Sequence, residues 1–335
     1  MHYQLSIFLM KNNPLVSIII PSFNRAGTIL DSINSAKAQT YTKIEIIVVD
    51  DGSSDETREV LKNVENIKYI HKTNGGQASA RNAGLQHANG EIISSLDSDD
   101  IWYPKFLEKC VNKLVADDLD FVFANWEQET PEGNTFTFLN KDFCLEPYFK
   151  NEKNGWVNLD HQELKDIYLS ACPSPSSSLI IKNSSIGNGW NPKIKVADDW
   201  FMYLDVITSG TRKAAFTLEV LWKKRINNQN VYDGRERVEL LEKLYMADFK
   251  ITMADLKDRL SLPEMQPLVN KHVYALLELA KHKMLRERKL ISSSKLAKQA
   301  FRIDSIRAFK SIHEIILFGL RSKMGLVKPN KNRPH

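Results

Sequence analysis

The sequence predicts an α/β fold with a mostly parallel central sheet and flanking helices, followed by a helical C-terminal region. Runs rich in β-branched residues at 16–20 and 44–49 are typical of strands buried on both faces of a parallel sheet. Helical patterns separate these and later runs, in units of about 20 to 30 residues. Such alternation favours strands joined by right-handed crossovers.

The first two helices follow from local spacing. Apolar residues from Ile29 to Ala36 share one helical face, so we expect a helix within 28–39. Ser53 stands three positions before Glu56, which is the spacing of a capping box, and this predicts that the second helix begins there.

Later elements continue the alternation. Strands are expected at 67–71, 91–97 and 120–125, with a glycine-bearing helical segment at 74–90 and a helix at 104–114. Pro104 suits the first position of that last helix, because its missing N–H has no partner there. From about Val238 onward no strand is evident. Apolar residues at helical spacing predict three helices around 276–285, 296–300 and 306–316.

The composition of the 335 residues indicates one large folded domain with an appendage. No apolar run reaches the length of a membrane span, and "LSIFLM" at 5–10 lacks the basic lead-in of a secretory signal. We therefore expect a cytoplasmic protein. Cys110, Cys144 and Cys172 are far apart and odd in number, which predicts neither a disulfide framework nor a zinc site.

A strongly basic segment closes the chain. Residues 281–335 carry fifteen Lys and Arg against Glu287, Asp304 and Glu314, so their net charge is +12 while the remainder is −7. Three interpretations stay open: helices that pack on the rest of the chain or on a second subunit, helices that attach to an anionic membrane surface, and a nucleic-acid surface. The last is least favoured, because aromatic residues are not interleaved with the basic ones.

Polar loops follow the first four predicted strands. Ligands of parallel sheets bind at the carboxyl ends of the strands, so these loops are expected to form one site. They are "PSFN" at 21–24, "DDGSSD" at 50–55, "NGGQASAR" at 74–81 and "DSDD" at 97–100.

The "DSDD" loop crowds Asp97, Asp99 and Asp100 into four positions. Like charges repel unless a cation or an exposed turn relieves them, and an Asx turn is the structural alternative here. An EF-hand fails, because Trp102 stands where that loop needs Gly. Carboxylates at a strand end, with room for a phosphate oxygen, suit Mg²⁺ or Mn²⁺.

Other polar residues have both structural and functional interpretations. Asp51 ends the second strand, where an acid can accept hydrogen bonds from a base or ribose. The glycines at 75–76, a helix N-terminus and Arg81 predict an anion site, although the segment is neither a Walker loop nor GxGxxG. Asp198 and Asp199 precede a helical stripe, where acids favour the helix dipole.

Four ordered segments carry a more specific signal. "VSIIIPSFNR", "EIIVVDDGSSDET", "NGGQASARNAGLQHANGEIISSLDSDDIWYP" and "SSLIIKNSSIGNGWNPKIKVADDW" together resemble the family 2 glycosyltransferases. The resemblance implies a Rossmann-like GT-A domain at 15–225. An N-terminal extension at 1–14 would precede it, and a basic, mostly helical region at 226–335 would follow.

The resemblance implies a donor site. Pro21 and Phe23 would line the nucleoside pocket, and Asp51 would accept hydrogen bonds from the base or ribose. Arg81 would face the diphosphate.

It also implies the metal and catalytic residues. Asp97 and Asp99 would form the DxD pair, with Asp99 the foremost ligand of Mg²⁺ or Mn²⁺ and Asp97 nearer the ribose or a metal-bound water. Asp100 is a further member of that cluster. Asp198 takes the place of the first acid of an ED-type motif, and Asp199 takes that of the general base.

Two departures from the family pattern stand out. Asp205 occupies a position where relatives commonly carry Arg, and the segment at 222–234 matches the downstream acceptor loop poorly. We assign no residue in that segment.

The implied function is that of an inverting, metal-dependent transferase. It would move a sugar from a nucleoside diphosphate sugar, foremost a UDP-sugar, to a hydroxyl of a glycan or lipid-linked acceptor in bacterial surface polysaccharide synthesis. It would work in the cytoplasm or at the inner face of the cell membrane. A non-catalytic nucleotide-sugar-binding or scaffold protein is the alternative, against which intact Asp99 and Asp199 argue. A sugar nucleotidyltransferase would need a glycine-rich activating loop after the first strand, which "PSFNRAGTIL" lacks.

Overall fold

The computed structural model describes residues 13–129, 133–225 and 236–323. They sort into two compact units. The α/β unit comprises residues up to 192 together with 198–226, and the helical unit comprises 193–197 together with the residues from 227 onward.

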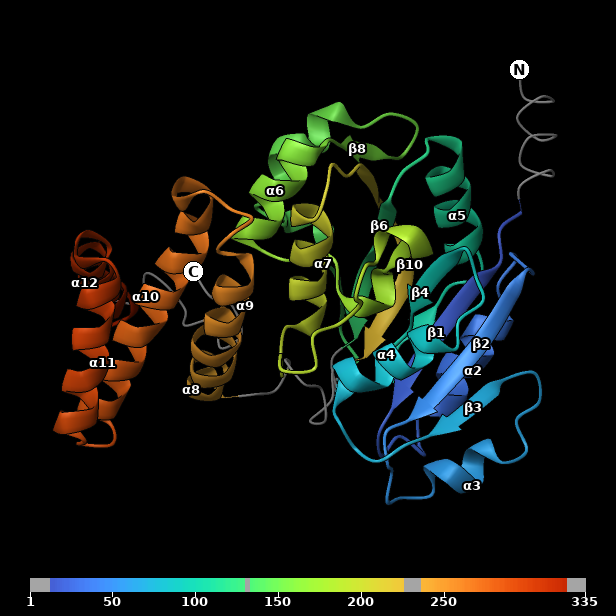
Figure 1. The fold of residues 1–335 in the computed structure, drawn as a ribbon, viewed down its shortest axis with the longest axis horizontal. Coiled ribbons are helices and arrows are strands. Elements are labelled where there is room, and N and C mark those ends of the chain that lie inside the picture. Colours follow the sequence, from blue (N-terminus) through green and yellow to red (C-terminus); the bar gives the residue numbers. More distant parts are fainter. Residues whose placement is uncertain (1–12, 130–132, 226–235, 324–335) are drawn as a thin grey trace. The chain divides into compact units, whose positions relative to one another are not determined.

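The α/β unit is built on one mixed sheet (Figure 1). Within the described residues its strands run in the order β3–β2–β1–β4–β9–β6–β10–β5, with β7 beside β6 and β8 beside β10. The β3–β2–β1–β4 half is parallel throughout, and β10 pairs parallel with β6. In contrast, β9 runs antiparallel to both its neighbours. The predicted α/β fold is therefore confirmed, with antiparallel strands added in its second half.

The elements have the following bounds. The strands are β1 (Val16–Ser22), β2 (Ile44–Asp50), β3 (Lys68–His71), β4 (Ile92–Ser95), β5 (Ile101–Trp102), β6 (Phe121–Glu129), β7 (Thr135–Thr137), β8 (Val157–Leu159), β9 (Ile180–Lys182) and β10 (Ala214–Arg225). The helices of this unit are α2 (Ile29–Lys37), α3 (Thr57–Leu61), α4 (Gln77–Gln86), α5 (Phe106–Ala116), α6 (His161–Ser170) and α7 (Asp198–Thr208). Short 3₁₀ turns include η3 (Ser176–Ser178).

The parallel register brings the strand ends level. Ser22 of β1 lies opposite Asp50 of β2, and Asp50 lies opposite His71 of β3. β1 is buried along its whole length, as the β-branched run predicts for a strand covered on both faces. The loops that follow these strands therefore start from one edge of the sheet.

Helix α4 lies close against β1, and a glycine allows it. Figure 1 shows α4 beside β1, and a Cβ added to Gly84 would lie 2.4 Å from Ile19 Cγ2. A side chain fits in that space only if Ile19, the helix or the strand shifts. The contact fixes the position of α4, and hence of Arg81 three residues before it.

Two predicted helix starts are wrong. Helix α3 begins at Thr57, and no side-chain capping bond forms at Glu56. The predicted capping box is absent because Ser53 hydrogen-bonds to the loop after β1. Ser53 Oγ accepts from the N–H of Asn24 at 2.9 Å instead. Helix α5 begins at Phe106, two residues after Pro104.

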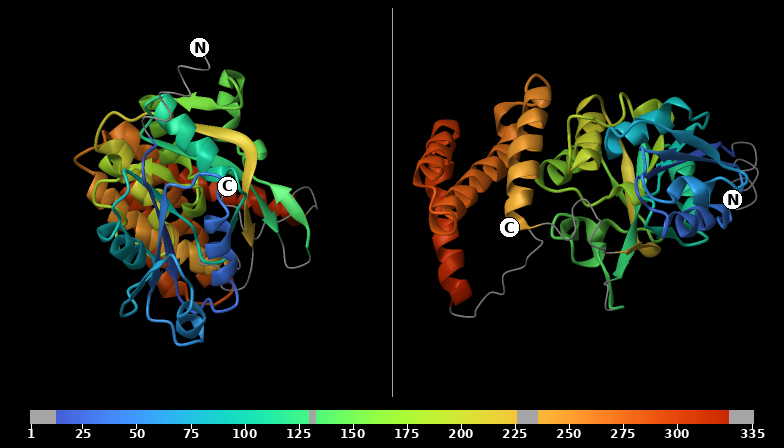
Figure 2. Two further views of the ribbon diagram at one scale, coloured as in Figure 1. Left: turned by 90° about the vertical axis from the view of Figure 1, so that its right-hand side faces the viewer. Right: turned by 90° about the horizontal axis from the view of Figure 1, so that it is seen from below.

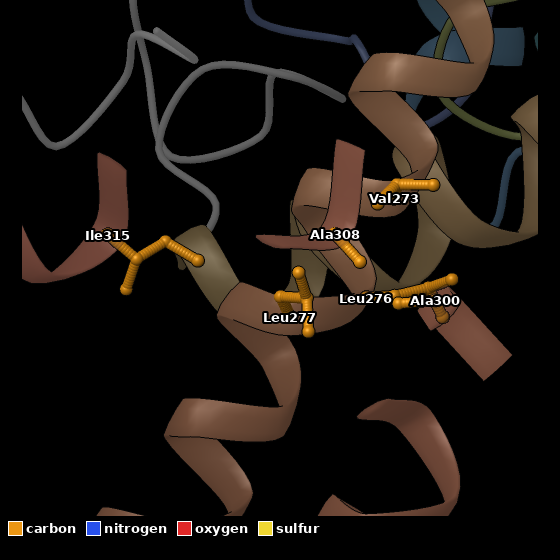
Figure 3. Packing of buried hydrophobic residues seen from close by; sticks show 6 residues of the cluster. All are labelled: Val273, Leu276, Leu277, Ala300, Ala308 and Ile315. Carbon is orange, nitrogen blue, oxygen red and sulfur yellow. The ribbon is translucent and has the colours of Figure 1, made fainter. Parts of the chain in front are cut away.

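The helical unit contains the predicted C-terminal helices. Its elements are α8 (Arg237–Leu240), the π-helical segment η5 (Leu241–Asp248), α9 (Phe249–Leu256), α10 (Leu262–Leu285), α11 (Leu290–Ile303) and α12 (Ser305–Lys323). Figure 2 shows α10, α11 and α12 packed together in orange and red. Figure 3 shows their shared core of Val273, Leu276, Leu277, Ala300, Ala308 and Ile315. Among the described residues, no helix is long and apolar enough to cross a membrane.

Candidate active site

Asp51 holds the glycine loop that follows β3. Its carboxylate lies 2.6 Å from Lys72 Nζ and accepts the N–H groups of Gly75 and Gly76 at 3.0 and 2.7 Å. Gly76 has a φ of +89°, which a residue with a side chain rarely adopts, and it directly precedes α4. Asp51 thus lies at the predicted edge, with its oxygens engaged by the loop that starts α4.

The loops after β1 and β2 are bonded to each other. Asn24, in the left-handed region with φ 53°, donates its N–H to Ser53 Oγ and accepts from the N–H of Ser54 at 2.8 Å. Pro21 is buried within β1, whereas Phe23 exposes 46% of its surface. Of the two residues predicted for the nucleoside pocket, only Phe23 presents its ring to solvent here.

Arg81 joins two motifs that are distant in sequence. Its guanidinium donates to Asp97 Oδ1 at 2.7 Å and to Asp198 Oδ2 at 2.6 Å, and it is 2% exposed. Gln77, also on α4, donates to the other oxygen of Asp198. Burial opposes the charge of Arg81, but Asp198 and Asp97 outweigh it and hold the pKa of the guanidinium above its usual value. The helix thereby connects the predicted DxD and ED-type segments.

The "DSDD" loop forms a turn with buried carboxylates. The N–H of Asp100 donates to the backbone carbonyl of Asp97 at 3.1 Å, whereas the Asx turn given as the structural alternative would use a side-chain oxygen as the acceptor. Asp99 and Asp100 are 5% and 2% exposed, and Asp99 lies 3.6 Å from Arg25 Nη2. Burial, followed by the charges of Asp99 and Asp97, raises the pKa of Asp100 well above its usual value. The turn geometry therefore does not relieve the crowding of like charges.

This loop would bind a metal ion only together with a bound diphosphate that supplies further oxygen ligands. Within the described ranges, no three His, Cys, Asp or Glu side chains are arranged to hold a metal ion. Mg²⁺, however, is commonly held by one or two carboxylates together with substrate phosphates and water. Burial and, after it, the charges of Asp99 and Asp97 raise the pKa of Asp100, and a nearby cation would lower that pKa again. The donor set is compatible with a metal that arrives with a diphosphate.

Asp198 and Asp199 occupy the first turn of α7. Asp198 is 1% exposed, whereas Asp199 is partly exposed and accepts the N–H of Trp200 at 2.7 Å. Burial raises the pKa of Asp199, while Arg81 opposes the shift. Burial likewise raises the pKa of Asp198, again against Arg81. The more accessible acid is the one predicted as the base.

Sequence reasoning missed the buried serines of η3. Ser177 Oγ donates to Asp100 Oδ2 at 2.6 Å and accepts the N–H of Asp97 at 3.0 Å. Trp102 Nε1 donates to the Ser177 carbonyl at 2.7 Å, which holds that turn against β5. The run "PSPSSSL" at 173–179 was the available signal, because serines bounded by prolines directly precede β9.

The end of β10 adds positive charge that the sequence did not assign. The N–H of Arg225 donates to Asp100 Oδ1 at 3.3 Å. The charge of Lys224 lowers the pKa of both Asp100 and Asp199, so it acts on both carboxylate groups. These residues belong to the 222–234 segment, whose remaining part lies outside the described residues.

Fold and site together define an α/β transferase of the GT-A type, with carboxylates gathered at the carboxyl ends of parallel strands. The profile described as "Glycosyl transferase family 2" matches residues 17–166. An uncharacterized glycosyltransferase of Rickettsia typhi is 32% identical over 72% of this chain and 74% of its own length. One from Rickettsia prowazekii is 49% identical over 65% of this chain and 67% of its own. The chain belongs to glycosyltransferase family 2.

Two solved structures share the fold. Staphylococcus aureus TarS 1–349 in complex with UDP-GlcNAc has a TM-score of 0.59 at 16% identity, covering 87% of this chain and 83% of that one. The mannosyltransferase PcManGT of Pyrobaculum calidifontis, in complex with GDP-Man and Mn²⁺, has a TM-score of 0.57 at 19% identity, covering 98% and 88%.

A named relative covers a smaller part. The Escherichia coli UDP-Glc:alpha-D-GlcNAc-diphosphoundecaprenol beta-1,3-glucosyltransferase WfgD is 41% identical over 34% of this chain and 46% of its own length.

Proposed function

We propose that the chain is an inverting glycosyltransferase. It moves a sugar from a nucleoside diphosphate sugar, foremost a UDP-sugar, to a hydroxyl of a glycan or lipid-linked acceptor in bacterial surface polysaccharide synthesis. The observation that carries the proposal is Arg81, which ties Asp97 to Asp198 and so gathers the carboxylates of two motifs. The nucleotide sugars bound by the fold neighbours and the lipid-linked acceptor in the name of WfgD support it. Residues 15–225 form the transferase domain in this proposal.

Asp199 acts as the general base. It takes the proton of the acceptor hydroxyl while that oxygen forms a bond to the anomeric carbon. The bond from the anomeric carbon to the phosphate oxygen breaks on the opposite face, and its electron pair leaves with the diphosphate. One displacement of this kind inverts the configuration. The raised pKa of Asp199 suits the role, because a base works best with a pKa close to the working pH.

The donor binds along the loops after β1, β2 and β3. Phe23 offers its exposed ring to the base, with Pro21 supporting the strand beneath it. Asp51 shapes the glycine loop and lies at the end of β2, where it faces the base or ribose. Arg81 keeps Asp97 in place and adds positive charge toward the diphosphate.

Asp99, with Asp97 beside it, would hold Mg²⁺ or Mn²⁺. When bound, the ion supplies positive charge against which the diphosphate leaves. Arg25, which lies 3.6 Å from Asp99, adds positive charge beside the bound diphosphate. Asp100 stays bonded to Ser177 and supports the turn.

Calorimetric titration tests the donor class first. UDP, GDP, CDP and dTDP are titrated with and without Mn²⁺, into the wild type and Asp99→Ala. Metal-dependent binding of one nucleotide that Asp99→Ala abolishes is the expected result. No binding of any nucleotide in the presence of Mn²⁺ would sink the proposal. Binding without turnover of any nucleotide sugar would favour the non-catalytic scaffold protein.

We also propose that the helical unit attaches the enzyme to the cytoplasmic face of the membrane. Large apolar side chains are exposed on α11 and α12, with Ile291 77%, Ile306 70% and Phe309 68% exposed. Basic residues accompany them, and four of these make no ion pair within the described residues: Lys295, Lys298, Arg302 and Lys310. A second copy would bring the same positive charge, whereas anionic lipid offers both apolar contact and neutralisation.

Sedimentation with vesicles tests the attachment. Phosphatidylglycerol vesicles should pellet the wild type at low salt and release it at high salt, because each basic residue contributes about 1 kcal/mol. Lys295→Gln/Lys298→Gln/Lys310→Gln should bind weakly. The matched control is Lys141→Gln/Lys150→Gln/Lys153→Gln, which removes three exposed lysines of the α/β unit and should bind like the wild type. Equal binding of the two triple variants would refute the attachment.

A further inference from the structure

Lys72 lies level with the two residues that frame the proposed nucleoside site. The last residues of β1, β2 and β3 are paired in register, and these strands lie side by side (Figure 1). The residues that directly follow them are Phe23, Asp51 and Lys72. The pairing continues past the strand ends, since Asp51 donates its N–H to the Ser22 carbonyl at 2.8 Å and Lys72 donates to that of Asp50 at 3.0 Å. Adjacent strands are about 4.8 Å apart, so the three residues span roughly 10 Å of one sheet edge.

The ammonium group of Lys72 is held in a fixed position. Its Nζ lies 2.6 Å from Asp51 Oδ1 and donates to the Thr73 carbonyl at 2.7 Å. An ammonium carries three N–H donors, and within the described residues these two bonds engage two of them. The side chain is 24% exposed, so the third donor is open to a ligand.

The oxygens of Asp51 are already engaged by the protein. They accept the N–H groups of Gly75 and Gly76 at 3.0 and 2.7 Å in addition to the Lys72 ammonium, and Asp51 is 3% exposed. Gly75 has no side chain that could cover the ammonium, because a Cβ there would lie 3.0 Å from Lys72 Nζ. A base whose ring stacks on Phe23 therefore directs its outer edge toward the N–H donor of Lys72.

We propose that Lys72 selects the base of the nucleotide by donating a hydrogen bond to a keto oxygen. The inference rests on the proposed function, in which a nucleoside diphosphate sugar is the donor. Uracil and thymine present the acceptor O4 at the place where cytosine presents the donor N4–H₂. A protein donor that faces the amino group of cytosine makes no hydrogen bond and repels it, so the site favours uracil over cytosine.

Calorimetric titration of UDP and CDP in the presence of Mn²⁺ tests the selection. A hydrogen bond to a charged group distinguishes two ligands by about 10- to 100-fold, so the wild type should bind UDP that much more tightly than CDP. Lys72→Met removes the donor and should bring the two dissociation constants within about threefold of each other. Lys72→Arg keeps a cationic donor and should retain part of the preference.

Two further variants sharpen the comparison. The amide of Lys72→Gln can donate to Asp51 and present its oxygen to the base, which suits the amino group of cytosine. The preference for UDP should therefore disappear or reverse in Lys72→Gln. Lys68→Met is the matched control, because Lys68 begins the same strand and its Nζ bonds the His87 carbonyl at 3.3 Å. It should keep the wild-type ratio of the two affinities.

The ratio of the two affinities separates base selection from simple support of the glycine loop. If Lys72 only braced Asp51, Lys72→Met would weaken UDP and CDP equally, and this unchanged ratio would overturn the proposal. An equal loss of preference in Lys68→Met would also overturn it. Should Lys72→Met fail to fold, a wild-type ratio in Lys72→Gln would have the same meaning.

The wild type alone distinguishes this proposal from the function on which it rests. Similar affinities for UDP and CDP would refute base selection by Lys72 and leave the transferase function standing. Failure of every nucleotide to bind in the presence of Mn²⁺ would refute the transferase function itself.

Discussion

Arg81 and Asp198 form a buried ion pair across 117 positions of sequence, with 2.6 Å between Nη1 and Oδ2. Neither residue is more than 2% exposed. Removing one partner of such a pair leaves an uncompensated buried charge, which costs more than the pair contributes when intact. The Arg81 guanidinium therefore holds carboxylates of both the DxD and the ED-type segments in place.

Replacing Arg81 should destabilise the α/β unit strongly. Arg81→Met leaves Asp198 buried without its cation and should lower the free energy of unfolding by about 3 to 5 kcal/mol. Arg81→Lys keeps the charge but loses the fork that reaches Asp97 and Asp198 together, so it should fall between Arg81→Met and the wild type. Urea unfolding followed by tryptophan fluorescence measures both. The control Lys243→Met removes an exposed pair with Glu239 and should cost about 0.5 kcal/mol or less. Similar midpoints for Arg81→Met and Lys243→Met would contradict the prediction.

Asp199→Asn should stop transfer and spare donor binding. A carboxylate base contributes on the order of 10² to 10⁴ in rate, and the amide cannot take the proton. Calorimetry with UDP and Mn²⁺ should give the wild-type affinity, because Asp199 is not a predicted donor ligand. Asp166→Asn makes the same chemical change at an exposed position on α6 and should keep full turnover. A variant that loses both turnover and UDP binding would show that Asp199 does not act as the base alone.

The first half of the sheet was predictable because its signals are local. The β-branched runs of β1 and β2 report burial on both faces, and the strand-end rule then places Asp51 and Asp97 at one edge. The C-terminal helices were predictable for the same reason, since apolar residues recur at helical spacing within each of them, as Leu276 and Ala280 do in α10 and Leu296 and Ala300 do in α11.

Other residues could not be found by local pattern. Ser177 reaches Asp100 across 77 positions, because β9 inserts antiparallel beside β4 and brings η3 to the edge. Asp248 accepts hydrogen bonds from backbone N–H groups, and because any residue can supply such a group, no sequence motif predicts the contact. β5 has two residues, too few to show a period. In each case long-range pairing, which one sequence does not display, determines the contact.

Asp100→Asn should stabilise the protein at neutral pH. Burial and the neighbouring carboxylates raise the pKa of Asp100 above the unfolded value of about 3.9. Between those two pKa values the folded chain holds a proton that the unfolded chain has released, so the free energy of unfolding falls as pH rises through this window. Asparagine has no titrating carboxyl group, so the substitution removes this pH-dependent loss of stability. Urea unfolding at pH 7 without metal should show a gain on the order of 1 kcal/mol, which shrinks as pH is lowered toward 5.

Asp55→Asn is the control with the opposite sign. Burial opposes its ionisation, but bonds from Thr57 and Ala26 outweigh burial and lower the pKa of Asp55. The ionised carboxylate of Asp55 stabilises the folded protein above the pKa that this group has in the unfolded chain. This stabilisation is lost as pH falls through the lower pKa of the folded state. Asp55→Asn should therefore unfold more easily than the wild type at pH 7. Destabilisation by both substitutions at pH 7 would contradict the assignment for Asp100.

Gly84→Ala should move α4 and weaken the nucleotide site with it. Alanine normally stabilises a helix by about 1 kcal/mol over glycine, but here its Cβ would lie 2.4 Å from Ile19 Cγ2, so the net effect should be a loss of about 1 to 3 kcal/mol. Because α4 carries Arg81, UDP binding should weaken as well. Ile19→Ala alone leaves a cavity and should cost about 2 to 5 kcal/mol. In the double variant the new methyl group occupies part of that cavity. The loss of unfolding free energy in the double variant should therefore be smaller than the sum of the two single losses by about 1 kcal/mol or more. A double-mutant cycle by urea unfolding measures this coupling. Simple additivity would mean that α4 does not rest on β1 through these two residues, and the position of Arg81 would then need another cause.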